Sequence, residues 1–299
     1  MPSSSFPLLR LPLVALREII EKIEPYEQYQ LSFCSKRTHF VIKTYRRKSP
    51  LSLKLFSLRG DIKINLLEEK FSSDCVQLSF KVRDSSKQIR ITKFLVDYLC
   101  DLFTARVEKV EANSKTDKIW MLDIVEERQG AFSYDAQVLN FGYGHNDEQL
   151  RHIFLDLNPK SLDIHQPASK QFRIDNFHKK YEKLIISPAT WMTGENLCQL
   201  DCVELEIYRY ISSTEINRFL KHVLRGGAPR LREFSAEIQV ANADVILDGI
   251  QELLTGSEQG EDEDGDWTLK GTVAREGGFV LVSIRFSALG IINMEIKGV

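Results

Sequence analysis

The N-terminal stretch 6–48 constrains the fold most, because it carries three short helical patterns separated by residues that end helices. Pro12 suits the first turn of a helix, where its missing N–H is not needed. Pro25 ends this helix and can begin the next, and Ser35 is a suitable N-cap for a third. The apolar residues of the first helix recur at helical spacing, at Leu13, Leu16, Ile19, Ile20 and Ile23.

Three helices of this size cannot bury an adequate core alone, so the module needs a surface to pack on. The helical pattern leaves two interpretations open, a cap on the chain's own domain or a binding module for another protein. The basic run 43–48 closes the third helix. We expect a solvated helix C-terminus there rather than a phosphate site, because cations suit the negative end of the helix dipole.

The spacing of particular residues within this stretch is a more specific signal. A Leu-Pro start at 11–12 is followed by Glu-Pro at 24–25 and by Leu-Ser-x-Cys-Ser-Lys-Arg at 31–37. The stretch thereby resembles the F-box, and the 31–37 run is similar to the F-boxes of the large nematode group. The matching positions are Leu11, Pro12, Leu16, Ile19, Ile23, Glu24, Pro25, Leu31, Cys34, Ser35, Lys36, Arg37, Val41 and Ile42.

The resemblance implies that this segment binds the Skp-type adaptor of a Skp–cullin–F-box ubiquitin ligase, and reaches the cullin indirectly through it. It also implies that the Leu-Pro start and the apolar positions of the first two helices face the adaptor. The implied contact residues are Leu9, Leu11, Pro12, Leu16, Ile19, Ile20, Ile23, Pro25, Leu31 and Cys34.

The composition of the chain is that of an ordinary globular protein, with 43% hydrophobic and 27% charged residues among 299. A net charge of −2 gives no strong field toward nucleic acid or a membrane. No apolar run reaches the length of a membrane span, and the N-terminus lacks the pattern of a secretory signal. The five cysteines are odd in number and irregularly spaced, which indicates reduced thiols in the cytoplasm or nucleus.

Residues 51–111 alternate between strand and helix patterns. An amphipathic helix is expected over 92–103, with Phe94, Leu95, Tyr98, Leu99 and Leu102 facing inward. A short helix is expected over 148–157, while 119–125 and 132–141 fit neither pattern decisively. Period-2 spacing predicts strands over 51–55, 62–66, 76–82 and 106–110.

A loose repeat follows in the second half of the chain. Short apolar strands are predicted at Leu162, Leu184, Leu205 and Leu231, whose spacings of 22, 21 and 26 residues overlap those of leucine-rich repeats. The best-formed unit opens with a strand-like stretch at 196–207. A helix over 214–224 comes next, with Ser212 and Glu215 forming a capping box.

This unit carries a second resemblance. The Asn-Leu-x-x-Leu-x-Cys opening at 196–202, the helix that runs from Glu215 and the Pro-x-Leu entry at 229–231 resemble the type-2 F-box-associated domain of nematode F-box proteins. The resemblance implies a leucine-rich-repeat-like βα arc that presents a substrate. Two departures are Val223, where the family often has an aromatic residue, and the acidic stretch 258–266, which has no match in the family pattern.

The C-terminal part predicts an antiparallel end to the sheet. The acidic stretch 258–266 is expected to be an ordinary loop, because the glycine and the distal glutamate of an EF-hand are misplaced. Alternating residues at 267–274 and 279–286 around Gly277-Gly278 predict a hairpin. A final strand over 291–296 is expected to cap the edge of the sheet.

No pattern typical of catalysis emerges. Cys198, Cys202 and His222 lack the paired spacing of a zinc site, and Cys202 is expected to be buried instead. The chain has no nucleophile elbow, phosphate-binding loop or dinucleotide glycine fingerprint. We therefore expect no catalytic residue, cofactor or metal, and neither a nucleic-acid nor a membrane partner.

These observations predict an α/β fold in which a three-helix F-box at 6–48 precedes an irregular leucine-rich-repeat-like β/α domain at 51–299. The second domain is best matched over 175–240 and ends in a β-hairpin. The expected function is that of a non-catalytic substrate-recognition adaptor of a Skp–cullin–F-box ligase, which holds an unknown protein target. The alternatives are a repeat-type scaffold, or an interaction protein that sequesters its partner without ligase activity.

Overall fold

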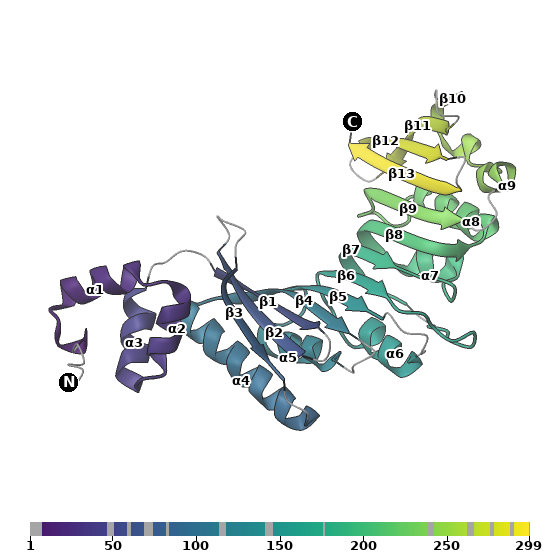
Figure 1. Ribbon diagram of the computed structural model, residues 1–299. Coiled ribbons are helices and arrows are strands. Elements are labelled where there is room, and N and C mark those ends of the chain that lie inside the picture. Colours follow the sequence, from purple (N-terminus) through teal and green to yellow (C-terminus); the bar gives the residue numbers. More distant parts are fainter. Residues whose placement is uncertain are drawn as a thin grey trace. The chain divides into compact units, whose positions relative to one another are not determined.

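The chain folds into two compact units, Met1–Glu111 and Ala112–Val299, in the computed structural model (Figure 1). The structure describes residues 8–46, 51–58, 61–68, 74–81, 84–113, 118–140, 146–175, 177–238, 242–261, 266–275, 278–287 and 290–298.

The N-terminal helices confirm the three predicted helical patterns. A short 3-10 turn, η1 (Leu8–Arg10), precedes α1 (Leu13–Lys22), α2 (Pro25–Ser32) and α3 (Lys36–Tyr45). Pro25 occupies the first turn of α2, and the Ser35 hydroxyl accepts a hydrogen bond from the N–H of Thr38 at 3.1 Å. These residues satisfy or remove N–H groups that a helix start would otherwise leave unpaired.

A small core holds the three helices together. Leu16 and Ile20 of α1 are buried, as are Val41 and Ile42 of α3. The buried Gln28 side chain of α2 donates to the carbonyls of Ile20 at 3.0 Å and Ile23 at 2.8 Å, at the end of α1. A buried amide that pairs with otherwise unpartnered helix-end carbonyls fixes the angle between α1 and α2.

The rest of the first unit is a sheet with one long helix. Its strands are β1 (Leu51–Leu58), β2 (Asp61–Glu68), β3 (Asp74–Phe80) and β4 (Arg106–Asn113), in the order β3-β2-β1-β4. All four predicted strands are present, and β1 pairs parallel to β4 and antiparallel to β2. The helix α4 (Ser85–Phe103) begins seven residues earlier than the predicted helix, because Asp84 caps it by accepting from the N–H of Lys87.

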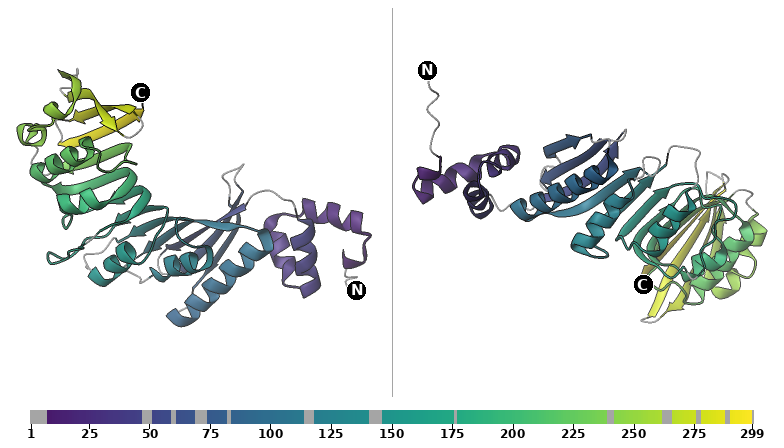
Figure 2. Two further views of the ribbon diagram at one scale, coloured as in Figure 1. Left: turned by 180° about the vertical axis from the view of Figure 1, so that it is seen from behind. Right: turned by 90° about the horizontal axis from the view of Figure 1, so that it is seen from below.

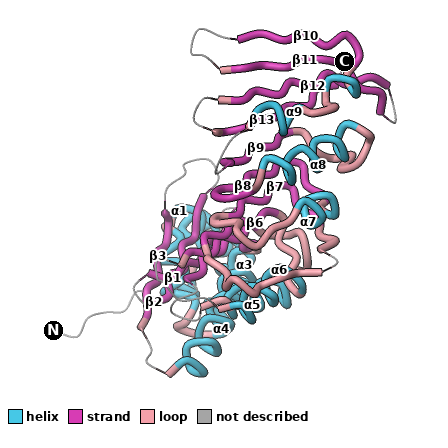
Figure 3. Tube along the Cα trace, turned by 90° about the vertical axis from the view of Figure 1, so that its right-hand side faces the viewer, coloured by secondary structure: helices cyan, strands magenta, loops and turns pink. Residues whose placement is uncertain are grey.

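The second unit alternates strands and helices. The helices are α5 (Trp120–Gln129), α6 (Asp147–Leu155), α7 (Gly194–Gln199) and α8 (Ser213–Leu224). Among them, those predicted over 148–157 and 214–224 are present as α6 and α8. The strands β5 (Asp135–Leu139), β6 (Ser161–His165), β7 (Lys180–Ile186), β8 (Asp201–Ile211) and β9 (Glu233–Ile238) pair in parallel in that order. Helices α6, α7 and α8 cover one face of these strands (Figures 2 and 3).

The opening of the best-formed repeat unit differs from the prediction. Asn196 and Leu197 lie in the short helix α7, and the strand begins only at Asp201. The reason is a capping box, since Thr193 accepts from the N–H of Asn196 while the Asn196 side chain accepts from the N–H of Thr193. Local hydrogen bonding therefore outweighs the strand-like pattern.

The predicted capping box of α8 forms only in half. Ser212 accepts from the N–H of Glu215 at 3.2 Å, as expected. The Glu215 carboxylate instead accepts from the N–H of Gly194 at 2.5 Å, at the start of α7. The carboxylate thus stabilises the positive end of a neighbouring helix and joins two successive repeats.

The C-terminal strands differ from the prediction in two respects, the structure of the acidic stretch and the position of the final strand. After α9 (Ala243–Leu247) and η3 (Gln251–Leu253) come β10 (Thr255–Glu261), β11 (Trp267–Arg275), β12 (Gly278–Phe286) and β13 (Ile291–Gly298). The β11–β12 hairpin is confirmed, but β13 lies between β12 and β9, and the edge strand is β10. The acidic stretch thus begins in a strand, while 262–265 lie outside the described residues. β13 pairs with β12 on one edge and with β9 on the other, so its backbone N–H and C=O groups find partners on both sides.

These elements confirm the predicted fold class, a three-helix module followed by a β/α domain that ends in antiparallel strands. No helix among the described residues is long and apolar enough to cross a membrane.

Candidate functional site

The three-helix module leaves large apolar side chains exposed at one end of α1 and on α3. Leu13 and Val14 are 66% and 77% exposed, and Phe40 is 66% exposed. Large apolar residues exposed on a small helical module are typical of a protein-binding surface. We refer to Leu13, Val14 and Phe40 as the exposed apolar set.

The residues that sequence resemblance assigned to adaptor binding fall into three groups. Pro12 and Cys34 are exposed, whereas Leu16 and Ile20 are buried in the helices' own core. A buried side chain can position the helices but has no free surface to offer a partner. The remaining six are partly buried, and are Leu9, Leu11, Ile19, Ile23, Pro25 and Leu31.

Sequence reasoning did not include the exposed apolar set among the candidate contacts. Leu13 shares the helical spacing of Leu16 and Ile20, which are buried, and Phe40 directly precedes the buried Val41 and Ile42. Val14 follows Leu13 directly and therefore lies about 100° further around the helix, away from the core formed by Leu16 and Ile20. This angular position was the signal available in the sequence.

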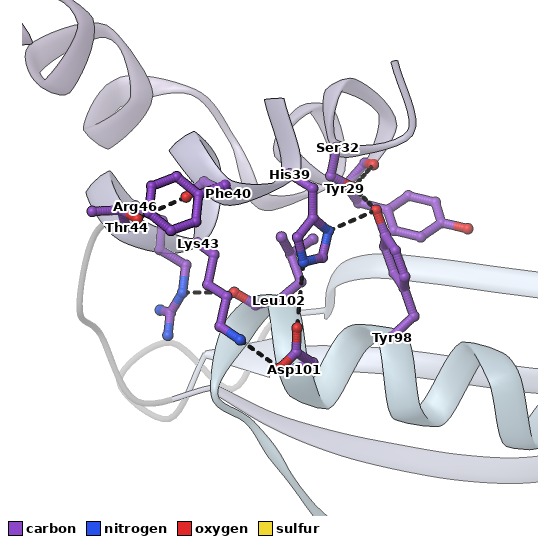
Figure 4. Close-up of polar contacts among 10 residues, drawn as sticks. All are labelled: Tyr29, Ser32, His39, Phe40, Lys43, Thr44, Arg46, Tyr98, Asp101 and Leu102. Carbon is purple, nitrogen blue, oxygen red and sulfur yellow. Dashed lines mark hydrogen bonds and ion pairs between the residues drawn. The ribbon is translucent and has the colours of Figure 1, made fainter. Parts of the chain in front are cut away.

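A second group of contacts joins α2 and α3 to α4 (Figure 4). The Tyr98 hydroxyl lies 2.5 Å from the Ser32 hydroxyl and 3.1 Å from Nδ1 of His39. The Asp101 carboxylate accepts from Lys43 Nζ at 2.5 Å and lies 3.3 Å from Nε2 of His39. Two residues one helical turn apart on α4 thus hold both helices, and we call these contacts the α4 seam.

Aromatic packing surrounds the polar contacts of the α4 seam. The Tyr98 ring is stacked on Phe33, with 4.6 Å between centroids and 12° between planes. Tyr29 meets the Tyr98 ring edge-on at 6.3 Å, and Phe94 lies beside it at 5.8 Å. The prediction that Phe94 faces inward is therefore wrong, since it is 55% exposed beside the helical module and not in the core of the sheet.

The basic end of α3 belongs to the same seam. Arg46 is buried, and its Nε donates to the carbonyl of Leu102 at 3.0 Å, at the end of α4. The expectation of a solvated helix terminus is therefore wrong for Arg46, while 47–50 lie outside the described residues. Burial lowers the pKa of the Arg46 guanidinium, although it remains charged at neutral pH.

The electrostatics of the seam favour its charged form. The hydrogen bond from Lys43 holds the pKa of the Asp101 carboxyl below its usual range, with a smaller contribution from His39. Burial raises the pKa of the Tyr98 hydroxyl, so that it stays protonated and can donate a hydrogen bond. These groups hold α2 and α3 in place on α4.

The cysteines weighed as a metal cluster do not form one. Within the described residues, no group of three or more His, Cys, Asp or Glu side chains is arranged to hold a metal ion. Cys202 is buried, as predicted, and burial raises the pKa of its thiol, which keeps it protonated. A protonated buried thiol is a packing residue rather than a ligand or nucleophile.

Comparison with known proteins agrees with both sequence resemblances. Residues 8–50 match the family model of the F-box domain, and residues 155–236 match the family model described as F-box associated. Comparisons with curated proteins and with solved structures gave no match. The first match spans α1–α3, and the second spans the parallel strands β6–β9 with α7 and α8. The chain therefore contains an F-box domain over 8–50 and, further along, a match to the F-box-associated domain over 155–236.

Proposed function

We propose that this protein is a substrate-recognition subunit of a Skp–cullin–F-box ubiquitin ligase. Its F-box binds a Skp-type adaptor, which connects it to the cullin, and its F-box-associated domain holds a target protein. The chain itself makes and breaks no bond. Its contribution is a high effective concentration of target lysines near the conjugating enzyme.

The observation that carries this proposal is the match to the F-box domain over residues 8–50, which contain the exposed apolar set. We assign the adaptor contact to the accessible members of both groups, namely the Leu11-Pro12 start together with Leu13 and Val14. Leu16 and Ile20, which are buried, hold α1 against α3 and so position this surface.

A second candidate is a non-catalytic scaffold or sequestering protein, in which the helices merely cap the chain's own domain. The α4 seam favours this candidate, because α2 and α3 pack on α4 as a cap would. A cap does not account for the exposure of Leu13 and Val14 on α1, so we prefer the ligase subunit.

Co-expression with a Skp-type adaptor tests the proposal. We expect the wild type to co-purify with the adaptor, and Leu11→Ala combined with Pro12→Ala to reduce recovery about tenfold, because the pair starts the contact surface. Failure of the wild type to bind would eliminate the F-box function. Adaptor binding without ubiquitin transfer to any recovered partner would support sequestration instead.

A further inference from the structure

The helix-free face of the second unit has a hollow of about 750 Å³ over strands β8, β9, β13, β12 and β11. Alternate residues of these strands are buried, for example Leu205, Phe234 and Met294, which also border the hollow. The intervening residues are mostly polar or charged and line the hollow. A sheet face left without helices, hollowed and lined by charges is available to a partner.

Carboxylates gather at the β8–β9–β13 side of the hollow. Glu204 on β8 is the register partner of Glu233 on β9, and Glu233 is the register partner of Glu295 on β13. Like charges directly opposite each other on neighbouring strands repel and destabilise a sheet. The chain thus holds three carboxylates in adjacent positions at a cost to its own stability.

A lysine pairs with each of the outer two carboxylates but not with the central one, and Lys183 is shared with Glu206, which lies 2.6 Å from its Nζ and also lines the hollow. Lys183 Nζ lies 3.2 Å from the Glu204 carboxylate, and Lys297 Nζ lies 2.7 Å from that of Glu295. Glu233 is exposed and has no ion pair or side-chain hydrogen bond with another described residue. A cation placed over Glu233 by a partner would relieve the repulsion from both sides.

The opposite side of the hollow is basic. In the same cross-strand row, Glu295 is followed by Ser283 on β12 and by Lys270 on β11. Lys270 is exposed, and Arg285 lines the hollow beside this row, with an ion pair of 2.9 Å to Asp266. The surface is therefore polarised, acidic at Glu233 and basic at Lys270.

We propose that this hollow binds an extended segment of a target protein, with a Lys or Arg side chain on Glu233 and an Asp or Glu side chain on Lys270. The inference rests on the proposed function, in which this domain holds the target, and adds the chemistry of the segment. Complementary charges at two ends of one hollow fix both the position and the direction of the bound chain.

The separation of the two ends sets the spacing of the recognised residues. Glu233 and Lys270 stand three strands apart in the row β9-β13-β12-β11, which is about 14 Å at the usual strand separation. An extended segment advances about 3.3 Å per residue, so this span corresponds to about four residues. Side chains at an even separation point to the same side of an extended chain, as the hollow requires.

Selection of a random short-peptide display library against the full chain tests this inference. We expect enriched peptides to carry a basic and an acidic residue about four positions apart. Glu233→Gln and Lys270→Gln should each weaken the selected peptides about tenfold, as the loss of one charge-assisted contact predicts. The matched control is Glu237→Gln, because Glu237 is exposed on the same strand but opposite Ile291.

Three results would overturn the inference: no enrichment, enrichment without the charge spacing, or equal loss of binding in Glu237→Gln and Glu233→Gln. The thermal midpoint checks folding, and we expect that of Glu233→Gln to equal or exceed the wild-type value, because the substitution removes a repulsion. Adaptor co-purification of the same preparation separates the two proposals. Adaptor binding without peptide enrichment rejects only the hollow, whereas loss of adaptor binding by the wild type rejects the ligase function.

Discussion

Substitution of Leu13 and Val14 by aspartate is expected to abolish co-purification with a Skp-type adaptor. Both side chains are largely exposed, so the double variant should fold with a free energy of unfolding within about 0.5 kcal/mol of the wild type. In an interface, burial of two such side chains is worth about 3 kcal/mol or more, and desolvation of two new charges adds to the loss. We therefore expect the affinity to fall at least about 100-fold, measured by calorimetry with the purified adaptor.

A matched variant separates this surface from a general effect of charge. Phe279 is 60% exposed on β12, in the other compact unit, so Phe279→Asp introduces the same chemistry outside the F-box. Adaptor affinity should be unchanged in Phe279→Asp. Full affinity of the Leu13→Asp, Val14→Asp protein would show that α1 does not contact the adaptor there, and would favour the capping role of the helices.

The sequence predicted local structure well where the signal was itself local. Pro25 and Ser35 mark helix starts by removing or satisfying backbone N–H groups, and the helices begin where these residues predict. The strands of the first unit followed from alternation, because burial of one sheet face imposes a period of two. The four parallel strands β6–β9 followed from evenly spaced apolar pairs for the same reason.

The predictions were wrong where the position of a residue or strand depends on contacts with an element distant in the sequence. Phe94 and Tyr98 share the helical spacing of the core residues of α4, and nothing in that spacing distinguishes packing on a sheet from packing on the three-helix module. The position of β13 depends on which strand it joins across a long separation in sequence. Glu215 was expected to cap the start of its own helix, α8. Its carboxylate instead accepts a hydrogen bond from the N–H of Gly194 at the start of α7.

The candidate sites show the same division. The Leu11-Pro12 start was found from motif spacing, whereas the exposed apolar set needed knowledge of which side of α1 meets α3. The hollow could not be predicted, because Glu233, Glu295 and Lys270 are adjacent only through strand register. Charged residues that are far apart in the sequence form a site only because strand pairing places them side by side in one cross-strand row.

Tyr98→Ala is expected to lower the free energy of unfolding of the F-box helices by about 2–4 kcal/mol. The variant removes the ring that packs on Phe33 and Tyr29, and also the hydroxyl shared by Ser32 and His39. Hydrogen exchange of α2 and α3 amides measures this directly, because loss of the seam raises the rate at which these helices open. Ile91→Ala on the same helix is the control, since Ile91 is 37% exposed and makes none of the described seam contacts.

Two more conservative substitutions measure the separate contributions of the Tyr98 hydroxyl and of the Asp101 carboxylate to the α4 seam. Tyr98→Phe keeps the ring and should cost about 0.5–1.5 kcal/mol, the usual value of a hydrogen bond. Asp101→Asn weakens an exposed ion pair with Lys43 and should cost less than about 1 kcal/mol. If the seam holds the F-box helices, Tyr98→Ala raises exchange in α2 and α3 more than in β1 and β2. Equal acceleration in the strands would mean that Tyr98 stabilises the sheet, and an unchanged rate in α2 and α3 would mean that the helices are held by other contacts.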